Sequence, residues 1–291
     1  MQEDFSMKSQ EKYISSASDV FFYTPSVTAM DTFFYPICTG HFFYEPGYRQ
    51  QRNSYDSFLF MYIASGEVMV EFDNRTEKAK AGDFVLLDCY KPHGYYTKTG
   101  WESLWMHFDG PLARSYYELI VSHLGNIFSM HDTYPVLNKL QQIYDTFANN
   151  APIKEPLISK QITDILTAML LYSPMHLKTN HHSHTIEEIV TYITEHFAED
   201  LQIEELADRA MLSHYHFIRI FKKETGFTPH EYIINLRLNT AKYLLKTTEL
   251  SIKDICFHTG FSCESVFCAA FKKNVRVTPT EYRRNPNTSL L

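Results

Sequence analysis

The chain has 291 residues, of which 44% are hydrophobic and 15% aromatic, and its formal net charge is −7. This length suits two domains with connecting segments, and the apolar content is ample for globular cores. No apolar run approaches the roughly eighteen residues of a membrane span, and the first ten residues, MQEDFSMKSQ, lack a hydrophobic segment. The sequence therefore predicts a cytoplasmic protein with no membrane span and no signal peptide.

The cysteines are odd in number and lack the CxxC or Cys/His spacing of a zinc site. We expect them to be reduced thiols with structural roles. They are Cys38, Cys89, Cys256, Cys263 and Cys268.

Residues 1–19 are predicted to form a polar N-terminal arm. From 20 to 110, short apolar or alternating runs are separated by turns such as Asp73-Asn74 and Ala81-Gly82-Asp83. Many short strands with regular turns are typical of a β-sandwich or small barrel. The predicted strand runs are 33–35, 40–44, 58–63, 68–72, 84–87 and 104–108.

Residues 111–178 change to helical periodicity, with a breaker at Asn149-Asn150-Ala151-Pro152 before the last segment. Such amphipathic helices can close the mouth of a barrel, pair with a second copy of themselves or pack only on their own barrel. A polar linker is predicted at 179–185. Its histidines could bind a metal in principle, but a cluster in a polar linker is usually solvated. They are His181, His182 and His184.

The last hundred residues contain an internal repeat. Phe221-Lys222-Lys223 returns as Phe271-Lys272-Lys273, and Thr228-Pro229 returns as Thr278-Pro279, each fifty residues later. Each copy has two apolar stripes at helical spacing with a turn between them, which is typical of a helix-turn-helix unit. The units are predicted at about 201–225 and 250–275, in a domain spanning 186–288.

The segment between the two copies is predicted to be one helix, from Pro229 to about Lys246. A proline in the first turn and no internal glycine favour an unbroken helix roughly 27 Å long. Such a strut sets two recognition helices about one turn of B-DNA, roughly 34 Å, apart.

Charge is distributed unevenly along this domain. Residues 185–208 hold eight acids and no Lys or Arg, whereas from Arg209 to the end thirteen Lys and Arg face six acids. Positive charge is therefore concentrated where the repeat places its second helices, as expected of a phosphate-binding surface. The alternative is a merely solvated surface.

These residues carry a family resemblance over about one hundred residues. The pattern resembles the DNA-binding domain of the AraC/XylS transcription regulators, and its double occurrence makes the match specific. The residues that carry it include Ser213, Phe217, Arg219, Phe221, Gly226, Thr228-Pro229, Tyr232, Arg237-Leu238, Ala241, Ser251-Ile252, Gly260-Phe261, Phe267, Phe271-Lys272, Thr278-Pro279 and Tyr282-Arg283.

The helical pattern of each second helix indicates which side chains face DNA. Exposed positions are predicted to contact base edges, and Arg219 suits the O6 and N7 atoms of a guanine. Cations near the helix ends are predicted to bind phosphates. The base-contacting set is His214, Tyr215, Ile218, Arg219, Glu264, Ser265 and Cys268, and the phosphate-binding set is Lys222, Lys223, Lys272, Lys273, Arg283 and Arg284.

The second unit departs from the family pattern. Cys263 and Ala269 stand where relatives usually carry a capping Asp and an outward Arg, and Arg276 stands where the first copy has Gly226. In the first copy, Met211 occupies a turn position where relatives often have glycine. We therefore expect the first unit to specify the operator and the second mainly to anchor.

The N-terminal half resembles the cupin-type effector domain of the same family, through Gly82-Asp83, Pro92-His93 and the segment from Trp101 to Gly110. The resemblance implies a ligand inside the jelly roll, with Trp105 as a stacking platform, and the aromatic and neutral polar groups suit a sugar. Side chains that only fill the barrel are the alternative. The implied effector-binding residues are Arg49, Arg52, His93, Tyr95, Trp101, Ser103 and Trp105.

The fold class predicted is α+β, with a cupin-like β-barrel or jelly-roll domain, a helical dimerisation segment at 111–178 and an all-α domain with two helix-turn-helix units. The function predicted is a DNA-binding transcription regulator, an activator of carbohydrate-utilisation genes that responds to a small sugar. Its partners would be promoter DNA, the effector, RNA polymerase and a second copy of the chain.

The alternatives are a regulator that needs no ligand or responds to a protein, and a cupin enzyme fused to a DNA-binding module. No enzymatic activity, metal or cofactor is predicted, since His41 and His93 alone cannot form a catalytic metal site.

Overall fold

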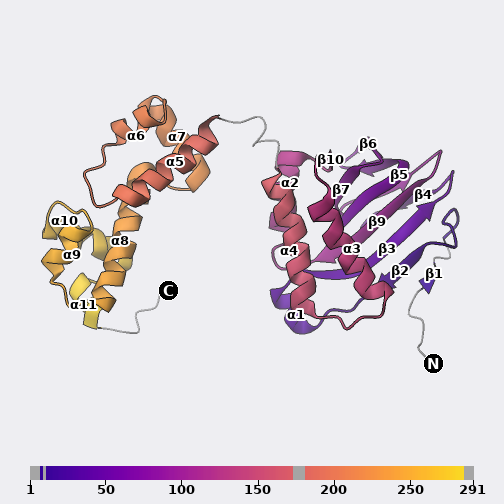
Figure 1. The fold of residues 1–291 in the computed structure, drawn as a ribbon, viewed down its shortest axis with the longest axis horizontal. Coiled ribbons are helices and arrows are strands. Elements are labelled where there is room, and N and C mark those ends of the chain that lie inside the picture. Colours follow the sequence, from indigo (N-terminus) through magenta and orange to yellow (C-terminus); the bar gives the residue numbers. More distant parts are fainter. Residues whose placement is uncertain (1–6, 9–10, 173–180, 285–291) are drawn as a thin grey trace. The chain divides into compact units, whose positions relative to one another are not determined.

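The structure is a computed structural model that describes residues 7–8, 11–172 and 181–284, with side chains described for 11–172 and 185–284. The chain divides into two compact units, Met1–Leu177 and Lys178–Leu291. The first is rich in strands and the second is helical (Figure 1). The predicted α+β class is confirmed.

The described strands of the first unit form one hydrogen-bonded network. They are β1 (Met7–Lys8), β2 (Asp19–Phe22), β3 (Tyr35–Tyr44), β4 (Arg49–Arg52), β5 (Phe58–Phe72), β6 (Arg75–Lys80), β7 (Asp83–Asp88), β8 (His93–Tyr96), β9 (Trp101–Asp109) and β10 (Ile127–Ser129). The main path runs β1-β2-β3-β9-β5-β7-β10, while β6 and β8 pair with β5, and β4 pairs with β8. Within the described residues this path has two ends, so the sheet does not close into a barrel.

Strand β5 belongs to two sheets. Its residues 58–66 pair with β7 and β9, and its residues 67–72 pair with β6 and β8. A register shift between Ile63 and Ser65 and a positive φ of 75° at Gly66 accompany the change of sheet. The runs predicted as two strands are therefore one strand with a bulge, and the two sheets enclose an interior of the jelly-roll type.

Both predicted turns are present beside β5. Asp73 and Asn74 have φ angles of 45° and 60° and connect β5 to β6, where Phe72 pairs with Arg75. Two left-handed residues in a two-residue turn match the twist of a hairpin. Gly82, with φ 94°, precedes β7.

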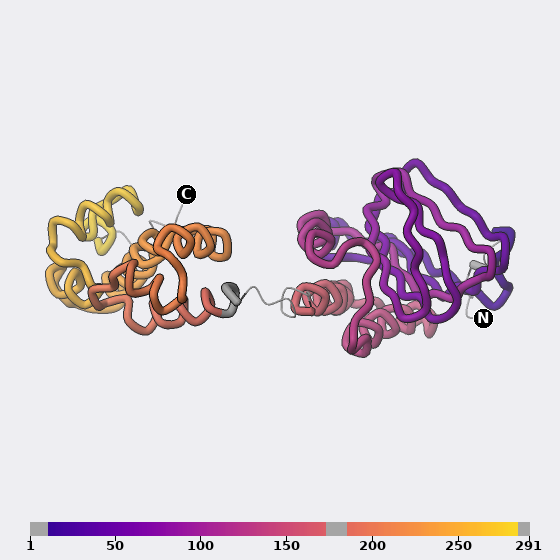
Figure 2. The backbone as a smooth tube through the Cα atoms, turned by 90° about the horizontal axis from the view of Figure 1, so that it is seen from above, coloured from indigo at the N-terminus to yellow at the C-terminus, as the bar shows by residue number. Residues whose placement is uncertain are grey.

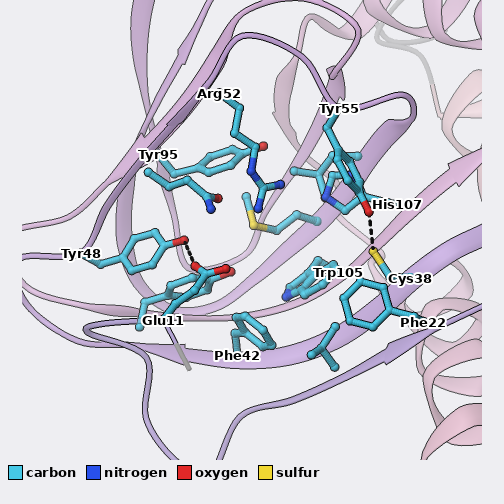
Figure 3. A pocket seen from close by; sticks show the side chains of 15 residues that line it. Glu11, Phe22, Cys38, Phe42, Tyr48, Arg52, Tyr55, Tyr95, Trp105 and His107 are labelled. Carbon is cyan, nitrogen blue, oxygen red and sulfur yellow. Dashed lines mark hydrogen bonds between the residues drawn. The ribbon is translucent and has the colours of Figure 1, made fainter. Parts of the chain in front are cut away.

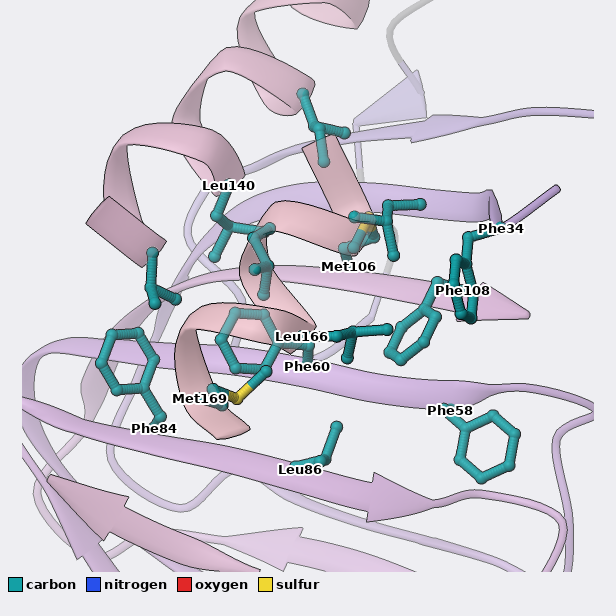
Figure 4. Packing of buried hydrophobic residues seen from close by; sticks show 14 of the residues in the cluster. Phe34, Phe58, Phe60, Phe84, Leu86, Met106, Phe108, Leu140, Leu166 and Met169 are labelled. Atoms are coloured by element: carbon teal, nitrogen blue, oxygen red, sulfur yellow. The ribbon is translucent and has the colours of Figure 1, made fainter. Parts of the chain in front are cut away.

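Alternating side chains of the central strands enter two different cores. On β9, Met106 and Phe108 pack toward the helices, whereas Trp105 faces the interior between the sheets. On β5, Phe58 and Phe60 likewise face the helices. Figure 4 shows this helix-facing core, and both overall views show the helices covering one face of the sheet (Figure 1, Figure 2).

The helical segment of the first unit packs on its own sheet. Helix α1 (Val27–Thr32) follows β2, and the covering helices are α2 (Ala113–Leu124), α3 (Tyr134–Ala148) and α4 (Glu155–Leu171). The apolar stripes of α3 and α4 are buried in the core that they share with the sheet. These stripes are therefore used within the chain and are not left for a second copy.

The structure describes parts of the predicted arm and of the predicted linker. In the predicted arm, the backbone is tied to the sheet, since Ser15 N donates to Phe43 O at 2.9 Å and Glu45 N donates to Tyr13 O at 2.8 Å. In the predicted linker 179–185, residues 181–185 already belong to helix α5 (His181–His196), because no Gly or Pro interrupts them. Residues 179–180 and the side chains of 181–184 lie outside the described part of the chain.

The second unit consists of helices only, over its described residues. They are α5, α6 (Ile203–Arg209), α7 (His214–Thr225), α8 (Pro229–Thr247), α9 (Ile252–His258), α10 (Glu264–Val275) and α11 (Pro279–Arg284). Phe217 and Phe221 of α7 are fully buried in one core, and Phe267 and Phe271 of α10 are fully buried in another. No described helix of the chain is long and apolar enough to cross a membrane.

Helix α8 is the predicted unbroken strut, and its 19 residues extend about 28 Å. It begins with a capping box, in which the Thr228 side chain accepts from Glu231 N and the Glu231 carboxylate accepts from Thr228 N. Ile233 enters the first helical core, whereas Leu238 and Leu245 enter the second. One helix thus holds both helix-turn-helix units.

A second connection joins the two cores beside α8. The Arg237 guanidinium donates to Phe197 O and to Glu199 O, both at 2.7 Å. A Cβ atom added to Gly260 would lie 2.7 Å from Ala198 O, so the α9–α10 turn meets the segment 197–199 too closely for a side chain.

The turns of the two repeats use glycine at different places. Gly226 ends α7 with φ 81°, and Arg276 ends α10 at the equivalent place with φ 70°. Conversely, Met211 has φ 52° in the first unit and Gly260 has φ 79° in the second. A non-glycine residue in this left-handed conformation costs about 1–2 kcal/mol, so the backbone at Met211 and at Arg276 is strained.

Replacing Arg276 by glycine is expected to stabilise the second unit. The relief of the left-handed conformation exceeds the extra chain entropy of glycine, for a net gain of about 0.5–1 kcal/mol in the free energy of unfolding. Gly226→Ala is the matched control: nothing lies within 4 Å of its added Cβ, so it should lose about 1 kcal/mol through the backbone alone. Urea denaturation of both variants measures this, and a less stable Arg276→Gly would contradict it.

Candidate ligand pocket and nucleic-acid interface

A cavity of about 630 Å³ lies in the interior of the first unit (Figure 3). Its size is within the range of small-molecule sites. It is lined by Val20 and Phe22 of β2, Cys38, Phe42 and Tyr44 of β3, Gln50 and Arg52 of β4, Leu59 and Met61 of β5, Tyr95 of β8, Trp105 and His107 of β9, and Glu11, Tyr48 and Tyr55 of connecting segments.

Arg52 supplies a cation to this cavity. Because side chains alternate along a strand, Arg52 and Gln50 of β4 lie on the cavity side. The guanidinium carbon lies 5.2 Å from the centre of the Tyr55 ring, and Figure 3 shows the group directed to the middle of the pocket. Arg49 lies on the other side of the strand, over Tyr96 and 3.3 Å from a Glu71 carboxylate oxygen.

His107 is one of the polar groups of the wall, and it is uncharged. Its Nδ1 is 2.8 Å from the Ser57 hydroxyl oxygen, which fixes the ring. Burial first, and then the charge of Arg52, lower its pKa from 6.5 to about 3. The imidazole is therefore uncharged at neutral pH.

Trp105 forms an aromatic wall whose position depends on the strand behind it. It is 8% exposed, and the Phe42 ring meets it edge-on at a centroid distance of 5.1 Å. The residue paired with it on β3 is Gly40. A Cβ atom there would lie 2.5 Å from the indole ring, so glycine leaves the space that the ring occupies.

Three of the seven residues predicted to bind an effector line the cavity, namely Arg52, Tyr95 and Trp105. The structure places the other four elsewhere. Trp101 stacks on Tyr44 with ring centroids 3.6 Å apart. Tyr44 lines the cavity, whereas Trp101 does not. Ser103 is fully buried outside the lining, and His93 borders a separate cavity of about 350 Å³ beside the β5–β6 turn. Arg49 points away, as described above.

Several lining residues are missing from the sequence-based set. His107 could have been found, because it follows Trp105 by two residues and strand alternation places both on one face. Glu11 could not have been found from the sequence, since it lies in the polar segment between β1 and β2, where no apolar pattern indicates which side chains face the interior. Its carboxylate accepts a hydrogen bond from the Tyr48 hydroxyl at 3.1 Å, within the pocket (Figure 3).

In the second unit, helix α7 presents most of its predicted DNA-contacting side chains to solvent. Tyr215 is 86% exposed and Arg219 is exposed, while Ile218 is half-buried. His214 is also half-buried, with Nδ1 3.4 Å from the Glu204 carboxylate. Ser213 is the N-cap residue, although its side chain accepts no capping hydrogen bond.

Helix α10 presents a different surface. Glu264, Ser265 and Ala269 are exposed, and Cys268 is half-buried. The N-cap residue Cys263 makes no capping hydrogen bond, and its thiol is 3.1 Å from the Ser265 hydroxyl. Over its described length this helix therefore offers no cation before Lys272.

The predicted phosphate-binding cations differ in their solvent exposure. The exposed ones are Lys222, Lys223, Lys272, Lys273 and Arg284. Arg283 is half-buried and donates to Leu250 O at 2.6 Å. Its guanidinium thereby joins α11 to the segment before α9, which is a structural contact.

Two family models match this chain. One, described as an AraC-like ligand binding domain, matches residues 36–166, and the other, a helix-turn-helix domain, matches residues 206–285. The Msm operon regulatory protein of Streptococcus mutans is 26% identical over 238 residues, covering 79% of this chain and 84% of that protein. The MmsAB operon regulatory protein of Pseudomonas aeruginosa is 22% identical over 262 residues, covering 86% and 82%. The HTH-type transcriptional activator RhaS of Escherichia coli O157:H7 is 33% identical over 96 residues, covering 33% and 34%.

The buried His107 predicts a pH dependence of stability. Its folded-state pKa of about 3 lies below the ordinary 6.5, so the unfolded chain binds a proton first as the pH falls. The stability that this residue contributes is complete above pH 6.5 and is lost progressively between 6.5 and about 3.

His107→Asn removes the titrating group and keeps a polar partner for Ser57. The variant is expected to be less stable than the wild type at about pH 7, and the difference should shrink toward about pH 4. Thermal unfolding of the two proteins across this range is the measurement. A difference that stays constant with pH would contradict the assignment.

Proposed function

Because this chain belongs to the AraC/XylS family of DNA-binding transcription regulators, we propose that it activates carbohydrate-utilisation genes in response to a small sugar-like effector. DNA binding and transcription regulation follow from the family. The effector is proposed from the cavity, and activation is proposed from the relative RhaS, which is named a transcriptional activator.

The composition of the cavity wall is the observation that supports a sugar. Hydrogen-bonding groups alternate there with flat apolar surface, as the hydroxyl and C–H faces of a sugar require. Trp105 supplies a broad aromatic face, and its indole nitrogen has no hydrogen-bond partner among the described residues. The polar groups of the wall include Glu11, Tyr44, Tyr48, Gln50, Arg52, Tyr55 and His107.

The exposed face of α7 supports sequence-specific DNA contact. Arg219 stands free of any hydrogen bond or ion pair within the described residues and suits a guanine edge, and Tyr215 suits a thymine methyl group. We propose His214 and Ile218 as further contacts of the same helix. On α10, Glu264, Ser265 and Cys268 would have a minor part in base recognition, beside anchoring cations.

RNA polymerase and a second copy of the chain are proposed as further partners, from the family alone. The buried stripes of α3 and α4 do not support pairing through those residues. A dimer would have to use the outer surface of the helical layer, where Leu157 and Leu171 are 51% and 70% exposed.

The proposed effector class is tested by thermal unfolding of the full chain against a panel of monosaccharides and disaccharides. A sugar that binds the folded state raises the melting temperature, and the stabilisation grows as RT ln(1 + L/Kd), where L is the free sugar concentration. The same sugar should change the retardation of a promoter fragment on a gel. Trp105→Ala should abolish the thermal shift and leave DNA binding without the sugar intact. If no sugar changes either readout, the effector is of another class.

The two helix-turn-helix units are expected to respond differently to substitution. Arg219→Ala should lose roughly 1–3 kcal/mol of discrimination at one base pair. The matched variant Lys272→Ala should weaken binding to all sequences alike and reduce the salt slope by about one. Competition binding with single-base operator variants measures both. Equal losses for base pairs under α7 and under α10 would refute the division of roles.

A further inference from the structure

We infer that the effector carries a carboxylate, so that the ligand class is a sugar acid, such as a hexuronate or an aldonate, with its carboxylate on Arg52. This inference rests on the proposed function, since it assumes that the cavity between the two sheets binds a sugar-like effector. It specifies one chemical group of that effector, the carboxylate.

The first observation is a half-buried cation that has no charged partner among the described residues. Among the described residues the Arg52 side chain forms no hydrogen bond and no ion pair, and its guanidinium lies over the Tyr55 ring. A guanidinium has five N–H donors in a fixed plane, and these match the two oxygens of a carboxylate. In Figure 3 the group projects into the space that the ligand would fill. The neighbouring Arg49, in contrast, has Glu71 as its partner.

The second observation is the charge balance of the wall. Among the described residues that line the cavity, Arg52 is the only Lys or Arg and Glu11 is the only acid. Glu11 is bonded to the Tyr48 hydroxyl, and Figure 3 places that pair apart from Arg52. One guanidinium suits a single negative charge. A phosphate ester, with nearly two negative charges, would suit a site with further cations, and the described lining residues include none besides Arg52.

The third observation is the neutral surface around the guanidinium. His107 lines the same end of the cavity and is uncharged, because burial and the charge of Arg52 hold its pKa far below neutral pH. The Tyr55 hydroxyl is 3.7 Å from the Cys38 thiol, so this side chain also has a neutral partner. A ligand carboxylate would therefore supply the negative charge that the protein itself does not place beside Arg52.

Matched ligands isolate the carboxylate. Binding of D-glucuronate and D-galacturonate to the full chain is compared by calorimetry with binding of D-glucose, D-galactose and D-glucuronamide, which keeps the shape of the uronate without its charge. At least one uronate is expected to bind about tenfold to a hundredfold more tightly than its neutral counterparts, as for a charge-assisted bidentate pair.

Two variants locate the effect. Arg52→Gln should remove the preference for the acid, while Arg52→Lys, which keeps the charge without the planar fork, should retain part of it. Arg49→Gln changes the neighbouring arginine that lies outside the cavity and should leave the preference unchanged. Melting temperatures without ligand establish that each variant is folded.

The outcomes separate this inference from the proposed function. If a neutral sugar binds as tightly as its acid, or if Arg52→Gln keeps the preference, the inference of a carboxylate bound to Arg52 is refuted. The proposal of a sugar effector is then unaffected. If neither acids nor neutral sugars bind, then both the sugar acid and the sugar effector are refuted. If glucose 6-phosphate binds more tightly than the uronates, the single-charge argument is wrong.

Discussion

The second unit depends on one helix that is shared by two hydrophobic cores. Ile233 near the start of α8 and Leu245 near its end are buried in different cores, so neither helix-turn-helix unit can be displaced without exposing part of the same helix. Arg237 adds hydrogen bonds to two backbone carbonyls of the segment 197–199, and Gly260 allows that segment to touch the next turn. The spacing of the two recognition helices is therefore held by packing and by hydrogen bonds.

In the first unit, the same strands contact the helices with one face and enclose the cavity with the other. Strand alternation makes this possible: successive residues of β9, Trp105 and Met106, belong to the inner and outer cores. Strand β5 pairs in both sheets and so connects the two walls of the cavity that Arg52 lines. The cavity wall and the helical layer are thus opposite faces of the same strands.

The sequence was sufficient for features that depend on local periodicity, and insufficient where contacts are distant. The helix from Pro229 was predicted to within one residue of its observed end at Thr247, because its cap and its apolar spacing are local. Strand alternation could not decide between Arg49 and Arg52, since the inner face of β4 is set by pairing with β8. Glu11 reaches the cavity through tertiary packing, which leaves no pattern in nearby residues.

The absence of a side chain at Gly40 has a consequence for how this pocket can change. Because the indole of Trp105 occupies the volume that a methyl group at position 40 would need, even an alanine there would force the ring to move toward the cavity or displace the backbone of β3. The shape of the cavity is consequently adjustable from position 40, which does not line it. Substitutions intended to reshape the cavity should therefore include residues behind its wall as well as those that line it.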